Sequence, residues 1–151
     1  MDDQLTIAGK TFNSRLMTGT GKHKTVEDLM ASVEKSQTEI ITVAIRRLKL
    51  DNPNEKTILD DLNWDNYQIL PNTAGSKTAD EAVFTAQLAR EVTGSNWIKI
   101  EVIPDPKYLL PDPIGTLEAA QKLIKDGFVC LPYMGADPEL AKRLEDIGCA
   151  T

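Results

Sequence analysis

The sequence has few aromatic residues and cysteines, and it has no long apolar segment. Aromatics make up 5% of the 151 residues, so a core has to rely on Ile, Leu, Val and Ala. The two cysteines, Cys130 and Cys149, form neither a CxxC pair nor a zinc-ligand spacing. No apolar run approaches the roughly 20 residues that cross a bilayer, and the N-terminus lacks the features of a signal peptide. We therefore expect a cytoplasmic protein with reduced thiols, no membrane association, no bound metal and no cofactor.

Basic charge is also in short supply. Lys and Arg together number 17 against 23 Asp and Glu, which gives a net charge of -6. The densest basic cluster is only Lys22, His23 and Lys24. A surface of this charge repels a phosphate backbone, so we expect no nucleic-acid partner. The length and the hydrophobic share of 41% fit a single α/β domain over residues 1–151.

What the chain does contain is a regular alternation of short apolar runs and helical patterns. A glycine turn predicts a small hairpin over residues 5–12, and Pro71 is expected to stop the third of the strands that follow. The predicted strands cover residues 15–18, 40–45, 67–70, 97–102 and 128–131. Helices are predicted to begin near Thr25, Thr78, Asp112 and Asp137, with a further short helix over residues 57–62. Strands that alternate with helices in this way predict parallel pairing and an α/β fold.

Two architectures fit about five such units. One is an open, doubly wound five-stranded sheet, for which 151 residues is a natural length. The other is an incomplete (β/α)8 TIM barrel, whose full form has eight units and about 250 residues. Pattern and length alone favour the open sheet.

The fourth strand favours the barrel instead. Side chains alternate along a strand, so Lys99 and Glu101 share one face. Helices cover both faces of a doubly wound sheet, and burying two charges under a helix is costly. In a barrel the same face points into the interior, where active sites lie at the carboxyl ends of the strands. We therefore predict an incomplete barrel after a small hairpin, with the open sheet as the alternative.

Lys99 and Glu101 also suggest a chemistry. A lysine on a desolvated wall loses its proton more readily, and the neutral amine attacks a carbonyl to form a Schiff base. A carboxylate two residues away moves protons during imine formation. The alternative is a buried ion pair that only fixes strand register. The Lys-x-Glu pattern by itself is common and leaves both interpretations open.

Further candidate residues follow the other strands. Gly19 and Thr20 lie in a glycine-rich turn after the first strand, although the spacing matches neither a P-loop nor a dinucleotide-binding loop. Arg46 has the parity of an inward-facing residue, so it is a candidate to pair with Glu101 or to hold an anion. After the third strand, Asn72 and Thr73 offer an amide and a hydroxyl. We expect these five residues to bind substrate, against the alternatives of ordinary turns and a surface arginine.

Taken together, six short segments resemble the thiazole synthase family of the thiamin pathway, the ThiG family. They occur in order at residues 18–22, 44–47, 70–75, 98–102, 109–113 and 127–133. Each segment is short, but their order makes the resemblance specific, and it covers essentially the whole chain.

This resemblance implies a (β/α)8 barrel that makes the thiazole phosphate precursor of thiamin. The substrates that it implies are 1-deoxy-D-xylulose 5-phosphate, dehydroglycine and the thiocarboxylated C-terminus of a small sulfur-carrier protein. The Schiff-base lysine of the family falls on Lys99 and its strand-four glutamate on Glu101. We also expect a homo-oligomer.

Members of the family continue for roughly three more βα units. Those units hold a later catalytic aspartate and the glycine-rich phosphate-binding loops, so we expect this chain alone to be inactive or nearly so. Two other interpretations stay open: a non-catalytic remnant or assembly module completed by another chain, and an unrelated open-sheet binding protein.

Overall fold

A computed structural model describes residues 3–48, 60 and 62–151. The described chain begins with an antiparallel hairpin of β1 (Leu5–Ile7) and β2 (Lys10–Phe12). Its turn places Ala8 and Gly9 at positive φ, 47° and 77°, the backbone that a tight two-residue hairpin turn requires. The predicted hairpin is therefore present.

Five parallel strands then form one sheet in the order β3-β4-β5-β6-β7, and an α-helix is described in each connection except that between β4 and β5. The strands are β3 (Met17–Gly19), β4 (Ile40–Ala44), β5 (Gln68–Asn72), β6 (Trp97–Ile100) and β7 (Val129–Pro132). The helices are α1 (Val26–Ser36), α3 (Ala79–Thr93), α4 (Pro113–Lys125) and α5 (Pro138–Asp146), with 3-10 turns η1 (Ile45–Arg47) and η2 (Trp64–Asn66). In the described part of the chain, every helix is too short or too polar to cross a bilayer.

The helices begin where the sequence places a cap. The side chains of Thr25, Thr78, Asp112 and Asp137 each accept a hydrogen bond from an amide in the first turn of the following helix. The short helix predicted over 57–62 falls on a segment that lies largely outside the described residues. Sequence caps therefore give the starts of all four α-helices named above.

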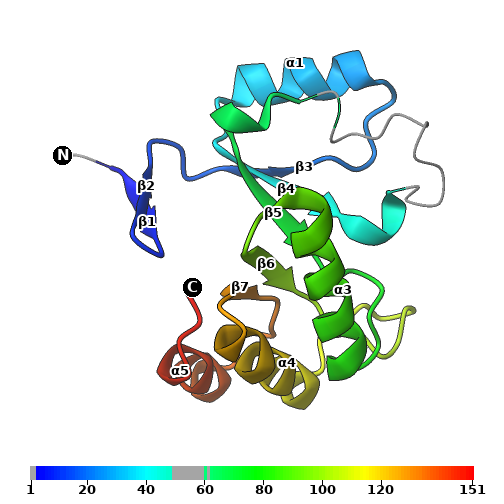
Figure 1. The fold of residues 1–151 in the computed structure, drawn as a ribbon, viewed down its shortest axis with the longest axis vertical. Helices are drawn as coiled ribbons and strands as arrows, with labels where there is room; N and C mark the ends of the chain where they lie inside the picture. The colour runs from blue at the N-terminus through cyan, green and yellow to red at the C-terminus, as the bar shows by residue number, and fades with distance from the viewer. Residues whose placement is uncertain (1–2, 49–59, 61) are drawn as a thin grey trace.

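The sheet has two different faces. On one face, Ile98 and Cys130 pack against buried residues of α3 and α4 such as Ala86 and Leu123, and Ile41 packs against α1. On the other face, the β1–β2 hairpin covers the amino ends of the strands, away from α3 and α4 (Figure 1). There the rings of Phe12 and Trp97 meet edge to face, 5.9 Å apart. Among the described residues, a pocket on the sheet lies at the other, carboxyl ends of the strands.

This arrangement is compatible with the incomplete barrel predicted from the sequence. The strands follow one another in chain order, whereas the order reverses at a switch point in a doubly wound sheet. The sheet is nevertheless open, because β3 and β7 are its two edges. Beyond β7, the Ala150 amide donates to the Cys130 carbonyl at 2.9 Å, so hydrogen bonding continues past that edge.

Pro71 does not stop the third strand, contrary to the sequence prediction. β5 is paired with β4 along its whole length, and Pro71 lies opposite Val43. The Thr73 amide donates toward β6, and by strand alternation the missing N–H of Pro71 falls on that same side. On the β6 side the register is limited to Asn72 with Lys99. The strand tolerates Pro71 because its missing N–H would point toward β6. The pairing between β5 and β4 therefore loses no donor.

Candidate functional site

Lys99 and Glu101 lie together on the face that the helices leave uncovered. The Lys99 Nζ is 3.0 Å from the Glu101 Oε1. Lys99 stands between Asn72 on β5 and Leu131 on β7, and Glu101 is the first residue after β6. The side chains share a face, as strand alternation predicts, even though the strand ends one residue earlier than Glu101.

This pair is only partly withdrawn from water. The Lys99 side chain is 36% exposed and that of Glu101 is 14% exposed. Lys99 is therefore more exposed to water than the desolvated position predicted from the sequence, and Glu101 is the more buried partner. An amine that is both reachable and held by a carboxylate is placed to react with a small molecule.

A pocket of about 230 Å³ opens beside Glu101, at the carboxyl ends of the strands. Four of the predicted site residues line it: Gly19, Thr20, Asn72 and Glu101. Lys99 is outside this lining, and its Nζ lies 3.0 Å from the carboxylate of Glu101, which is part of it. The remaining lining residues are Gly21, Thr42, Ala44, Arg47 and Ala74. Segments from four strands thus meet at one place, which is where parallel α/β folds bind ligands.

The polar groups of this pocket differ in what they can still bind. The Thr20 hydroxyl donates to the Thr42 carbonyl at 3.2 Å, so it is already engaged. The Asn72 Oδ1 accepts from the Ala74 amide at 3.2 Å. Among the described residues, the amide nitrogen of Asn72 has no hydrogen-bond partner, so Asn72 retains donors for a ligand.

Arg46 does not face this pocket, contrary to the parity argument. β4 ends at Ala44 and the chain turns into η1, so strand alternation no longer applies at Arg46. Its guanidinium donates to the Gly75 carbonyl at 2.7 Å and pairs with Glu81 at 3.5 Å.

Arg47 is the arginine that faces the pocket, where the sequence predicted Arg46. Arg47 lines the pocket, and its guanidinium lies against Gly21, where an added Cβ would meet Nη1 at 2.6 Å. In the part of the chain that the structure describes, Arg47 has no ion-pair or hydrogen-bond partner. Sequence reasoning missed this residue because the 3-10 turn after β4 leaves no signal in the alternation.

Thr73 is buried and lies outside the pocket lining. It has no exposed surface. Its hydroxyl donates a hydrogen bond to the Glu101 carbonyl and accepts one from the Glu101 amide, both at 2.8 Å. Its side chain is therefore turned toward the protein, not toward a ligand.

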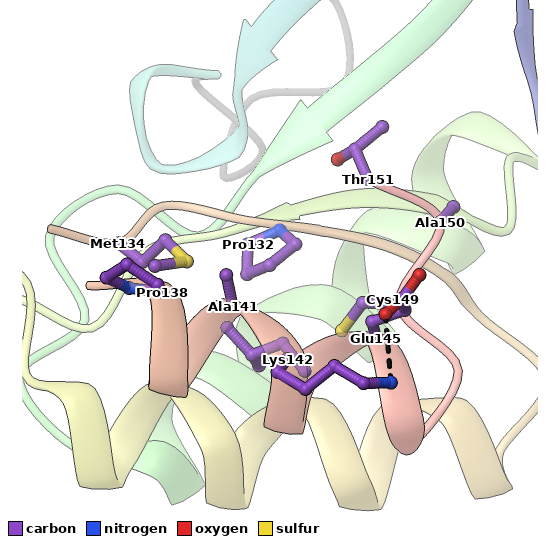
Figure 2. A pocket seen from close by; sticks show the side chains of 10 residues that line it. Pro132, Met134, Pro138, Ala141, Lys142, Glu145, Cys149, Ala150 and Thr151 are labelled. Carbon is purple, nitrogen blue, oxygen red and sulfur yellow. Dashed lines mark hydrogen bonds and ion pairs between the residues drawn. The ribbon is translucent and has the colours of Figure 1, made fainter. Parts of the chain in front are cut away.

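A second hollow, of about 560 Å³, lies between β7, α5 and the C-terminal residues (Figure 2). Its Lys142 pairs with Glu145 at 3.1 Å, and it shares no lining residue with the smaller pocket. Burial raises the pKa of the Cys149 thiol to about 11, so this cysteine stays a thiol at neutral pH. Although larger, this hollow lacks an activated nucleophile, and the chemistry points to the pocket beside Glu101.

Comparison with known sequences identifies similar proteins over nearly the whole chain. The sequence model of the family described as "Thiazole biosynthesis protein ThiG" matches residues 6–151. The chain is 57% identical to a thiazole synthase of Cytophaga hutchinsonii and 55% identical to one of Thermosynechococcus vestitus. In both cases 99% of this chain is covered, against 58% and 56% of the relative.

A bifunctional protein ThiO/ThiG of Trichormus variabilis is 55% identical over the whole chain, which spans 24% of that protein. The chain therefore spans between about a quarter and three fifths of the length of these relatives. Among solved structures, a chain of the Amycolatopsis orientalis BexX/CysO complex superimposes with a TM-score of 0.80 at 26% identity. That match covers 97% of this chain and 59% of the other.

Proposed function

The chain belongs to the ThiG family of thiazole biosynthesis proteins, and on this basis we propose that it carries the imine-forming centre of a thiazole synthase. The observation that carries the proposal is the Lys99–Glu101 pair, which is held at 3.0 Å beside a pocket at the carboxyl ends of the strands. In this proposal Lys99 is the nucleophile and Glu101 the proton carrier.

The proposed step converts a ketose phosphate into an imine on Lys99. The Lys99 ammonium gives a proton to the Glu101 carboxylate, and the free amine adds to the ketone carbon. The resulting carbinolamine takes a proton from Glu101 on its hydroxyl group and loses water, which leaves a carbon–nitrogen double bond to Nζ. Because Glu101 lies at 3.0 Å, no intervening water is needed to move the proton.

The pocket supplies the groups that hold the substrate. We assign the amide nitrogen of Asn72 to a substrate hydroxyl, since it has no partner among the described residues. Gly19 and Thr20 shape the wall by bringing the backbone close. Arg47 is the cation of the pocket lining, and we assign it an anionic group of a substrate or co-substrate.

The ketose that we propose is 1-deoxy-D-xylulose 5-phosphate, with dehydroglycine as the second small substrate. We also propose a sulfur-carrier protein as the sulfur donor, because a solved structure with the same fold is a complex with CysO. A cytoplasmic location is part of this proposal, since both cysteines are free thiols. We propose that the described residues carry the imine step, which is one part of the reaction that we assign to the family.

Reductive trapping tests the proposed function. The chain is incubated with 1-deoxy-D-xylulose 5-phosphate and cyanoborohydride, and the intact mass is recorded for the wild type, Lys99→Arg and Lys122→Arg. Lys122 is the matched control, because it also pairs with carboxylates, Asp80 at 2.7 Å and Glu118 at 2.8 Å, but lies outside the pocket beside Glu101. We expect single labelling of the wild type and Lys122→Arg and none of Lys99→Arg. Equal labelling of all three proteins overturns the proposal.

A further inference from the structure

The Glu101 backbone is held by a side chain and not by the sheet. β6 ends at Ile100, so Glu101 lies beyond the regular ladder. Its amide donates to the Thr73 Oγ1 at 2.8 Å, and its carbonyl accepts from the same hydroxyl at 2.8 Å. Both backbone polar groups of Glu101 are therefore bonded to one hydroxyl.

A threonine hydroxyl has one proton and two lone pairs, so it can donate and accept at the same time. Thr73 directly follows β5, as Glu101 directly follows β6. The Thr73 amide also donates to the Lys99 carbonyl at 3.1 Å. One residue thus fixes the backbone at both members of the reactive pair.

This contact also replaces part of an interrupted ladder. Pro71 has no N–H to donate, and the register between β5 and β6 is limited to Asn72 with Lys99. The hydroxyl of Thr73 joins the two strands one residue further on. Because Thr73 is fully buried and β-branched, its side chain has little freedom to leave this position.

We propose that Thr73 is a positioning residue that holds Glu101 at hydrogen-bond distance from Lys99, and that it does not bind substrate. The inference rests on the proposed function for its catalytic meaning. Thr73 has no exposed surface, whereas the Lys99 side chain is 36% exposed, so any effect of Thr73 on the reaction has to pass through the backbone of Lys99 and Glu101.

Three variants separate positioning from binding. Thr73→Val keeps the shape but removes the hydroxyl, and Thr73→Ser restores it. Thr116→Val is the matched control, because Thr116 is equally buried and its hydroxyl has no partner within the described residues. Trapping kinetics at Lys99 are measured against ketose concentration for each protein.

We expect Thr73→Val to lower the maximal trapping rate about tenfold, because a misplaced proton-transfer group raises the barrier. A tenfold loss of rate corresponds to an activation free energy higher by about 1.4 kcal/mol. The half-saturating ketose concentration should stay within about twofold of the wild type, because Thr73 does not touch the ligand. Thr73→Ser should recover most of the rate, and Thr116→Val should match the wild type. A raised half-saturating concentration with an unchanged maximal rate contradicts the inference and indicates substrate binding.

Amide hydrogen exchange at Glu101 gives a readout that does not depend on the reaction. We expect exchange at least tenfold faster in Thr73→Val than in the wild type, and unchanged exchange in Thr116→Val. If the wild type takes no label at Lys99, the proposed function fails, and Glu101 exchange still decides whether Thr73 holds this backbone. Unchanged exchange in Thr73→Val overturns the inference.

Discussion

Replacing Glu101 by glutamine separates a catalytic pair from an ion pair that only fixes register. Glutamine has nearly the same shape, so it keeps the packing and a hydrogen bond to Lys99, but it cannot take up a proton. The Glu101 side chain is 14% exposed and lies 3.0 Å from Nζ, so bulk water replaces it poorly as a proton carrier. The substitution therefore tests proton transfer with little change of geometry.

The expected loss of rate follows from this position. A positioned acid–base group contributes about 10²-fold to 10⁴-fold, so Glu101→Gln should slow trapping at Lys99 by at least about 100-fold. The loss of stability should be small, about 0–1 kcal/mol, because Lys99 is 36% exposed and water screens the ion pair.

The assay compares trapping rates with urea unfolding for the wild type, Glu101→Gln and Glu118→Gln. Glu118 is the matched control, since it pairs with Lys122 at 2.8 Å on the helix surface, away from the pocket. Glu118→Gln should leave trapping unchanged. If Glu101→Gln traps ketose within twofold of the wild-type rate while its stability falls, the pair is structural and the reasoning is refuted.

The remaining predictions concern the pocket cation and the hairpin. Arg47→Gln should raise the half-saturating concentration of an anionic ketose about tenfold and leave that of uncharged hydroxyacetone unchanged. Arg46→Gln should change neither value, because Arg46 is bonded to the Gly75 carbonyl. Equal effects of the two substitutions would refute the assignment of Arg47. Phe12→Ala removes a ring that is 2% exposed and packed against Trp97, so the free energy of unfolding should fall by about 3–5 kcal/mol in urea titration. A loss below about 1 kcal/mol would show that the packing of the hairpin on the amino ends of the strands adds little to stability.

Much of the fold can be predicted from local signals in the sequence. Caps such as Thr25 and Asp112 mark helix starts because their side chains accept amide hydrogen bonds, which is a property of a few neighbouring residues. The alternation of strands and helices gives the parallel sheet for the same reason. Pro71 is different, since whether a strand tolerates a proline depends on which neighbour would receive its hydrogen bond.

In the site too, positions set by neighbouring residues can be predicted, and contacts between distant segments cannot. Lys99 and Glu101 share a face because they lie two residues apart on or next to a regular strand. Arg47 lines the pocket, and Arg46 does not, because η1 begins at Ile45 and ends the strand alternation on which the prediction for Arg46 rests. The role of Thr73 needs a contact across 28 residues of sequence, which only the folded chain brings together.

The central claim is that Lys99 is the nucleophile that forms the imine. The most direct measurement is the position of the label after cyanoborohydride trapping of the wild-type chain with 1-deoxy-D-xylulose 5-phosphate, read by tandem mass spectrometry of its peptides. We expect nearly all of the label on Lys99 and almost none on Lys122 or Lys142, which pair with carboxylates on helix surfaces and lie outside the pocket beside Glu101. Label spread over the exposed lysines, with Lys99 no richer than the others, would contradict the claim.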